Sequence, residues 1–166
     1  FRCVNGMFYL ILGHLFVYHS LFISRPNLDF ALVGLLVSLG LCFYVMLWAI
    51  IDPRILLRKT KKGVRRLNDA IGIIKGMIIL IGCELLILYS MVFCCYNTDN
   101  HFYQVAGGRL LDSWDFVYYL ITSFSTIGYG DIVPIRYNGD IHSILISIII
   151  ALSSLFTTGC FVGAVV

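Results

Sequence analysis

Charged residues are scarce in this sequence, which holds 12 Lys or Arg and 9 Asp or Glu among 166 residues, while 60% of the residues are hydrophobic. Ordinary soluble domains are about 45 to 50% apolar, so this composition excludes that class and places the chain in a lipid bilayer. The length leaves room for four spanning helices of about 20 residues and one re-entrant loop. The predicted fold class is therefore an all-α membrane protein.

Paired cysteine spacings and clusters of catalytic side chains are also absent. Six cysteines lie mostly inside apolar runs, where they are expected as small buried hydrophobes: Cys3, Cys42, Cys83, Cys94, Cys95 and Cys160. The histidines lie on separate segments: His14, His19, His101 and His142. They offer no site for metal or nucleophile chemistry, so we expect no enzymatic activity, no organic cofactor and no nucleic-acid partner. No cleavable signal peptide is visible, and we expect both ends of the sequence to be truncated.

The apolar runs mark four predicted spans, at residues 3–24, 30–51, 76–98 and 141–166. Pro53 ends the second span because proline cannot continue the ladder of backbone hydrogen bonds. The third span carries a single charge, Glu84, and an ionised side chain at this depth is costly. We therefore expect Glu84 either to pair with His14, which lies at similar depth in the first span, or to stay protonated and hydrogen-bond a backbone carbonyl.

Eight of the twelve basic residues lie in the segment 54–75. The positive-inside rule places this segment in the cytoplasm, so both ends of the sequence are expected there and residues 97–112 are expected outside the cell. Basic residues at every third or fourth position are also typical of voltage-sensing helices. Here the intervening residues are often polar and the preceding spans offer no acidic partner at membrane depth. A linker that contacts anionic lipid headgroups is the preferred interpretation.

A short apolar run at 114–125 ends in Thr126-Ile127-Gly128-Tyr129-Gly130-Asp131. Glycine adopts φ > 0 without penalty, which allows consecutive carbonyls to point toward one axis. Such a sequence also forms turns in soluble proteins, but here it lies between membrane-length apolar segments, where irregular backbone is tolerated only along a water-filled path. The pattern predicts a re-entrant helix, capped by Asp112 or Ser113, followed by a loop that lines such a path.

This hexapeptide and its flanks resemble the pore domain of tetrameric potassium channels over residues 76–166, with an outer helix, a pore helix, a selectivity filter and an inner helix. The resemblance implies that backbone carbonyls and the Thr126 hydroxyl bind K⁺ in the filter: Thr126, Ile127, Gly128, Tyr129 and Gly130. K⁺ ions at residues 126–129 are the expected bound metal. One strand supplies a quarter of each oxygen ring, so we expect a homotetramer surrounded by membrane lipids. The chain then divides into an N-terminal two-helix hairpin (1–52), a basic cytoplasmic linker (53–75) and the pore module (76–166).

Family members often carry two tryptophans in the pore helix, at positions that hold Tyr118 and Tyr119 here. Together with Asp131 these tyrosines are expected to support the filter, with a hydrogen bond from Tyr118 to Asp131. Some members place a glutamate where this sequence has Thr122, so one acidic partner of Asp131 is missing. The resemblance therefore does not imply that this chain undergoes the slow inactivation of the family.

The glycine that many relatives use to bend the inner helix falls on Ile150 here. We expect bending or close helix contact lower down, at the candidate gate residues Gly159 and Gly163. By the same alignment, one stripe at helical spacing is expected to face the water-filled cavity: Ala151, Ser154 and Thr158.

Three alternatives to a homotetrameric potassium channel stay open at this point. The chain would be half of a two-pore-domain channel if a second filter motif exists beyond the given sequence. A less selective cation channel on the same scaffold and a non-conducting membrane subunit are the others. The sequence does not predict the gating stimulus or rectification.

Overall fold

The computed structural model describes residues 28–51, 66–105 and 107–165. The predicted first span and His14 lie outside the described residues. The described part is mostly helical, with four α-helices, one short 3-10 helix and one pair of short strands. In chain order the elements are α2 (Leu28–Ile51), α3 (Arg66–Thr98), η2 (Asn100–Phe102), β1 (Tyr103–Val105), α4 (Ser113–Phe124), β2 (Ile132–Pro134) and α5 (His142–Val165).

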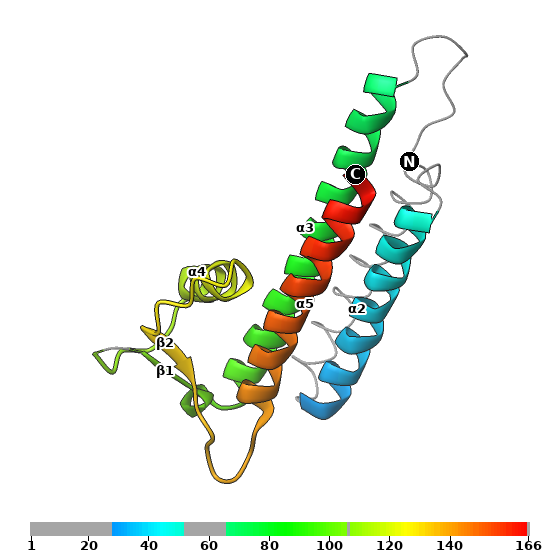
Figure 1. Cartoon of the computed structure of the whole chain (residues 1–166). Helices are drawn as coiled ribbons and strands as arrows, with labels where there is room; N and C mark the ends of the chain where they lie inside the picture. The colour runs from blue at the N-terminus through cyan, green and yellow to red at the C-terminus, as the bar shows by residue number, and fades with distance from the viewer. Residues whose placement is uncertain (1–27, 52–65, 106, 166) are drawn as a thin grey trace.

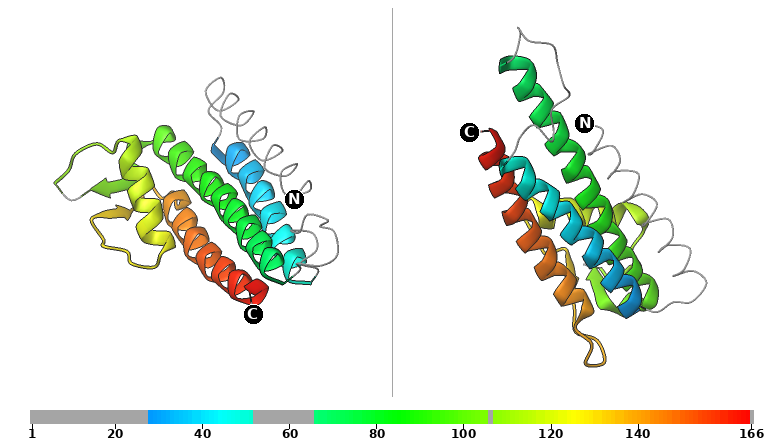
Figure 2. Two further views of the ribbon diagram at one scale, coloured as in Figure 1. Left: turned by 90° about the horizontal axis from the view of Figure 1, so that it is seen from above. Right: turned by 90° about the vertical axis from the view of Figure 1, so that its right-hand side faces the viewer.

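Three of these helices are long and apolar enough to cross a membrane, within Leu28–Trp48, Ile71–Thr98 and His142–Gly163. They correspond to the second, third and fourth predicted spans. Figures 1 and 2 show them packed side by side, with α2 on one side of the α3–α5 pair and α4 on the other. The short helix α4 matches the predicted re-entrant helix at 114–125.

Helix α3 begins at Arg66, whereas the predicted span began at residue 76. The basic linker predicted at 53–75 is therefore helical in its described part. No proline interrupts residues 66–98, and Leu67, Ile71 and Ile74 continue the apolar spacing of the span at helical period. The helix therefore begins ten residues before the predicted span, because no residue between 66 and 76 interrupts its backbone hydrogen bonds.

The core between the long helices is made of large apolar side chains with almost no exposed surface, among them Leu35, Met46, Leu80, Ile87 and Ile150. Ile150, which stands where many relatives have the glycine that bends the inner helix, is fully buried in this core. Five cysteines also lie in this interior as free, buried thiols, as predicted: Cys42, Cys83, Cys94, Cys95 and Cys160.

A small antiparallel sheet ties together the two loops that flank α4. Tyr103 pairs with Pro134 and Val105 with Ile132. The backbone N–H of Ile135 extends this link by donating to the Phe102 carbonyl at 2.9 Å. The sequence pattern did not predict these strands, which are three residues long.

Candidate functional site

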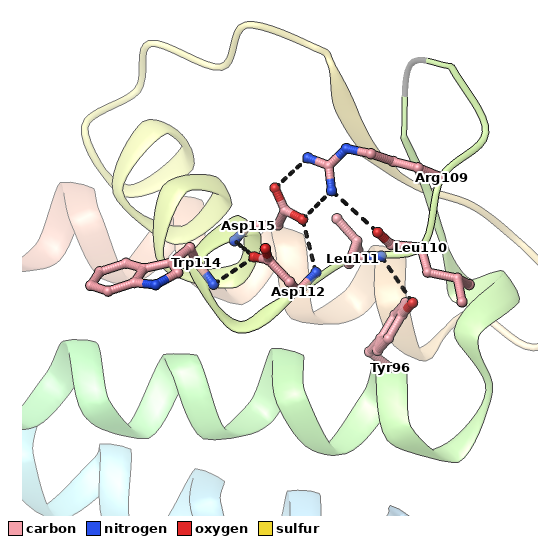
Figure 3. Close-up of polar contacts among 7 residues, drawn as sticks. All are labelled: Tyr96, Arg109, Leu110, Leu111, Asp112, Trp114 and Asp115. Atoms are coloured by element: carbon pink, nitrogen blue, oxygen red, sulfur yellow. Dashed lines mark hydrogen bonds and ion pairs between the residues drawn. The ribbon is translucent and has the colours of Figure 1, made fainter.

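The beginning of α4 is fixed by reciprocal hydrogen bonds (Figure 3). Asp112 is the N-cap, and its Oδ1 accepts from the backbone N–H of Trp114 at 2.8 Å and of Asp115 at 3.0 Å. Asp115 Oδ2 accepts in return from the Asp112 N–H at 2.8 Å. This capping box satisfies N–H groups that have no partner inside the helix. Of the two residues predicted as the cap, the structure selects Asp112.

A bidentate ion pair joins this helix start to the preceding loop. Arg109 Nη1 and Nη2 each lie 2.6 Å from an oxygen of Asp115, as Figure 3 shows. The hydrogen bonds from Arg109 lower the pKa of Asp115 to about 2. The Leu111 N–H also donates to the Tyr96 hydroxyl at 3.0 Å, which anchors the same loop to α3.

Replacement of Arg109 by alanine is expected to raise the pKa of Asp115 toward its ordinary value and to lower stability slightly. Because the pKa is depressed in the folded state, the ion pair stabilises the protein above about pH 4, and this contribution disappears as the pH falls toward about 2. Thermal unfolding between pH 2 and pH 7 measures the effect. Arg136→Ala is the matched control, because Arg136 forms no ion pair among the described residues and only donates to the Gly139 carbonyl. Equal pH profiles for the two variants would contradict the assignment.

The backbone after α4 turns sharply around the carbonyl of Thr122. This carbonyl accepts from the N–H groups of Ile127 and Gly128, both at 3.0 Å, and the Thr126 N–H donates to the Ser123 carbonyl at 3.1 Å. Thr122 is buried, and its hydroxyl donates to the Tyr119 carbonyl at 3.1 Å. This role of Thr122 was not predicted, because the sequence draws attention only to the carboxylate that Thr122 lacks.

The segment 126–130 alternates between ordinary and left-handed backbone. Gly128 has φ +53° and Gly130 has φ +75°, as expected for the two glycines. Thr126 also has φ +60°, which is unusual for a β-branched residue and was not predicted. In the single chain the whole segment is exposed, including the side chains of Ile127 (58%) and Tyr129 (68%).

The two tyrosines predicted to support this segment lie in different environments. Tyr118 is partly exposed and stacks on Tyr129, with ring centroids 6.3 Å apart and planes 4° from parallel. A hydrogen bond to the Asp131 carboxylate raises the pKa of the Tyr118 hydroxyl. Tyr119 is buried instead, and its hydroxyl lies 2.7 Å from Ser147 Oγ on α5. The structure thus brings Tyr118 and Asp131 together and places Tyr119 against the neighbouring helix.

The predicted cavity stripe on α5 is split in the structure. Ala151 and Thr158 are exposed, whereas Ser154 is buried and donates to the carbonyl of Phe124, the last residue of α4. Within the chain the Ser154 hydroxyl faces α4, because the carbonyl at that helix end needs a donor. The place of Ser154 in the cavity stripe stays a prediction. The candidate gate residues Gly159 and Gly163 lie on the exposed side of the helix.

Glu84 lies in the interior between the long helices, with no exposed surface. Its Oε2 accepts a hydrogen bond from Thr157 Oγ1 of α5 at 2.6 Å, and that hydroxyl lies 3.8 Å from Met46 Sδ of α2. Glu84 Oε1 has no hydrogen-bond partner among the described residues. The observed partner is a side-chain hydroxyl and not the predicted backbone carbonyl. Pairing of Glu84 with His14 stays a prediction, because His14 lies outside the described residues.

Comparison with protein families gives a match to a family model described as an ion channel, over residues 76–166. The match covers more than half of the sequence and runs from within α3 to the end of α5. Comparisons with curated proteins and with solved structures found no match.

Proposed function

The chain belongs to the ion channel family, and from this premise we propose that it is a potassium-selective channel subunit that conducts K⁺ through a central pore formed by four filter strands. The observation that carries the proposal is the exposed segment 126–130, with left-handed backbone at Thr126, Gly128 and Gly130. Alternating backbone of this kind lets successive carbonyls point in one direction, and rings of carbonyls replace the hydration shell of K⁺. The three apolar helices and the family indicate a multi-pass membrane protein.

In the proposed mechanism K⁺ is the cargo and the chain supplies oxygen ligands. The carbonyls of residues 126–130 and the Thr126 hydroxyl offer successive binding positions along the pore. Each strand gives one quarter of a ring, so a homotetramer completes the coordination. The C-terminal end of α4 comes just before Thr126, and the helix dipole makes that end favourable for a cation.

The distribution of basic residues sets the proposed orientation of the protein in the membrane. The basic segment 54–75 lies in the cytoplasm, in contact with anionic lipid headgroups, and both ends of the given sequence lie on the same side of the cell membrane. The filter then opens toward the outer side, supported by Tyr118, Tyr119 and Asp131. Ala151 and Thr158 line the cavity below it, and Gly159 and Gly163 form the gate region.

Ion flux through purified protein in liposomes tests the function directly. We expect a reversal potential that follows the K⁺ gradient and ignores the Na⁺ gradient. Comparable permeability to both ions would indicate a less selective cation channel, and absence of flux would indicate a non-conducting subunit. Cross-linking in the same liposomes separates a tetramer from the dimer expected of a two-pore-domain channel.

Neutralising Arg58 and Arg65 to glutamine is expected to leave the voltage dependence of the current nearly unchanged. The segment 54–66 is too polar to cross the bilayer, whereas each charge that crosses the whole field contributes about 2.3 kcal/mol per 100 mV. Current–voltage curves of the double variant measure this. A large shift in half-activation would show that the segment senses voltage.

A further inference from the structure

Three serines of α5 contact α4 or the chain that follows it, and we call Ser143, Ser147 and Ser154 the serine face. Their spacing of four and seven residues puts them on one side of a helix. Ser143 and Ser154 are buried, with 0% and 5% of their surface exposed. Each hydroxyl reaches a different part of the pore loop, the stretch from α4 to the start of α5.

Two of the contacts lie on opposite sides of the segment 126–130. Ser154 donates to the carbonyl of Phe124, at the end of α4 and shortly before Thr126. Ser143 donates to the carbonyl of Ile135 at 2.7 Å, just after β2. The segment 126–130 is therefore suspended between two points that are both fixed to the same helix.

The third contact holds α4 itself. Ser147 Oγ donates to the Ser143 carbonyl at 2.8 Å, which uses its single proton. The Tyr119 hydroxyl, 2.7 Å away, is then the donor to Ser147 Oγ. This assignment satisfies both hydroxyl groups and orients the buried Tyr119 ring toward α5.

The contacts of Ser143 and Ser154 differ from what serines in the other long helices do. Ser38 of α2 donates to the Gly34 carbonyl at 3.1 Å, and Ser90 of α3 donates to the Leu86 carbonyl at 2.9 Å. Such bonds to the preceding turn are the ordinary way for a serine to satisfy its hydroxyl in an apolar helix. Ser143 and Ser154 use their protons on the pore loop instead.

We propose that Ser143, Ser147 and Ser154 are positioning residues for permeation, which fix the two ends of the segment 126–130 relative to α5 and thereby set its selectivity for K⁺. The proposal rests on the function proposed above. A ring of carbonyls selects between ions by the spacing and the number of its oxygen atoms. Loss of one hydrogen bond releases an end of the loop and so shifts the carbonyls that form the ring. We therefore expect a variant that lacks one of these hydroxyls to assemble normally but to distinguish K⁺ from Na⁺ less well.

Alanine substitutions at Ser154 and Ser143 test this, with Ser153→Ala as the matched control. Ser153 is buried beside Ser154, but no hydrogen bond among the described residues joins it to the pore loop. One hydrogen bond is worth about 1 kcal/mol, so each test variant should lower the K⁺/Na⁺ permeability ratio roughly fivefold. Ser153→Ala should leave the ratio unchanged, and Ser154→Thr, which keeps a hydroxyl, should retain most of the selectivity.

Amide hydrogen exchange in the same proteins gives a readout that does not depend on ion selectivity. The N–H groups of Ile127 and Gly128 should exchange roughly fivefold faster in Ser154→Ala, because release of the Phe124 carbonyl loosens the turn at Thr122. In Ser153→Ala their exchange should be unchanged. If the wild type proves unselective but the exchange changes as expected, the proposed function fails and the positioning of the loop stands. If the wild type is selective and both readouts match the Ser153→Ala control, the positioning role is overturned.

Discussion

Gly128→Ala is expected to abolish K⁺-selective current. Gly128 has φ +53°, and a side chain in the left-handed region costs about 1 to 2 kcal/mol. An added Cβ meets no atom within 4 Å in the single chain, so the penalty is conformational rather than a clash. In the proposed tetramer the cost falls four times on one ring of carbonyls. Reversal potentials in opposing K⁺ and Na⁺ gradients measure the loss.

The matched control is Gly139→Ala. Gly139 has φ +87° and equally open surroundings, but it lies in the turn before α5, outside the segment 126–130. This variant should lose a similar amount of stability and keep the permeability ratio of the wild type. A selective current in Gly128→Ala would show that the segment does not line the ion path.

Thr157→Val is expected to lower the free energy of unfolding by about 2 kcal/mol. The substitution preserves the shape of the side chain but removes the hydroxyl that donates to Glu84 Oε2. Glu84 then lacks a hydrogen-bond partner among the described residues, and an unsatisfied buried group costs about 1 to 3 kcal/mol. Thermal unfolding in detergent at fixed protein concentration measures the change.

The double variant Glu84→Leu/Thr157→Val should recover much of that loss, because it replaces both polar partners by apolar groups. Thr158→Val is the control for stability, since the neighbouring Thr158 is exposed. A double variant whose loss equals the sum of the single losses would show that the two side chains do not interact. Coupling between Glu84 and His14 stays a prediction.

Local patterns predicted the parts of the molecule that depend on nearby residues. The apolar runs located α2, α3 and α5 because membrane-length helices need little beyond composition. A cap at Asp112 or Ser113 followed from the place of these residues before an apolar run, and the structure has it at Asp112. The left-handed φ at Gly128 and Gly130 followed from the absence of a Cβ. In each case the neighbouring residues in the sequence were enough to predict the local structure.

The contacts between distant segments were not predictable in this way. A hydroxyl in an apolar helix can donate to its own preceding turn, to another helix or to a cavity, and the sequence does not distinguish these outcomes. The sequence placed Ser154 in the cavity stripe from the family resemblance and did not predict that its hydroxyl donates to Phe124. Thr157 was overlooked as the partner of Glu84 because the two residues lie on different helices. The left-handed Thr126 also had no sequence signal, since its conformation follows from the turn around the Thr122 carbonyl.

Helix α5 contains neither glycine nor proline before Gly159, and Ile150 near its middle is fully buried. Its first 17 residues, from His142 to Thr158, form a stiff rod about 25 Å long. Such a rod turns as a unit, because kinks require a proline, a glycine or an inserted group. Ser143 and Ser154 lie on this rod, so both ends of the segment 126–130 are held by one rigid element. When the rod moves, the Phe124 and Ile135 carbonyls therefore move with it and keep their separation.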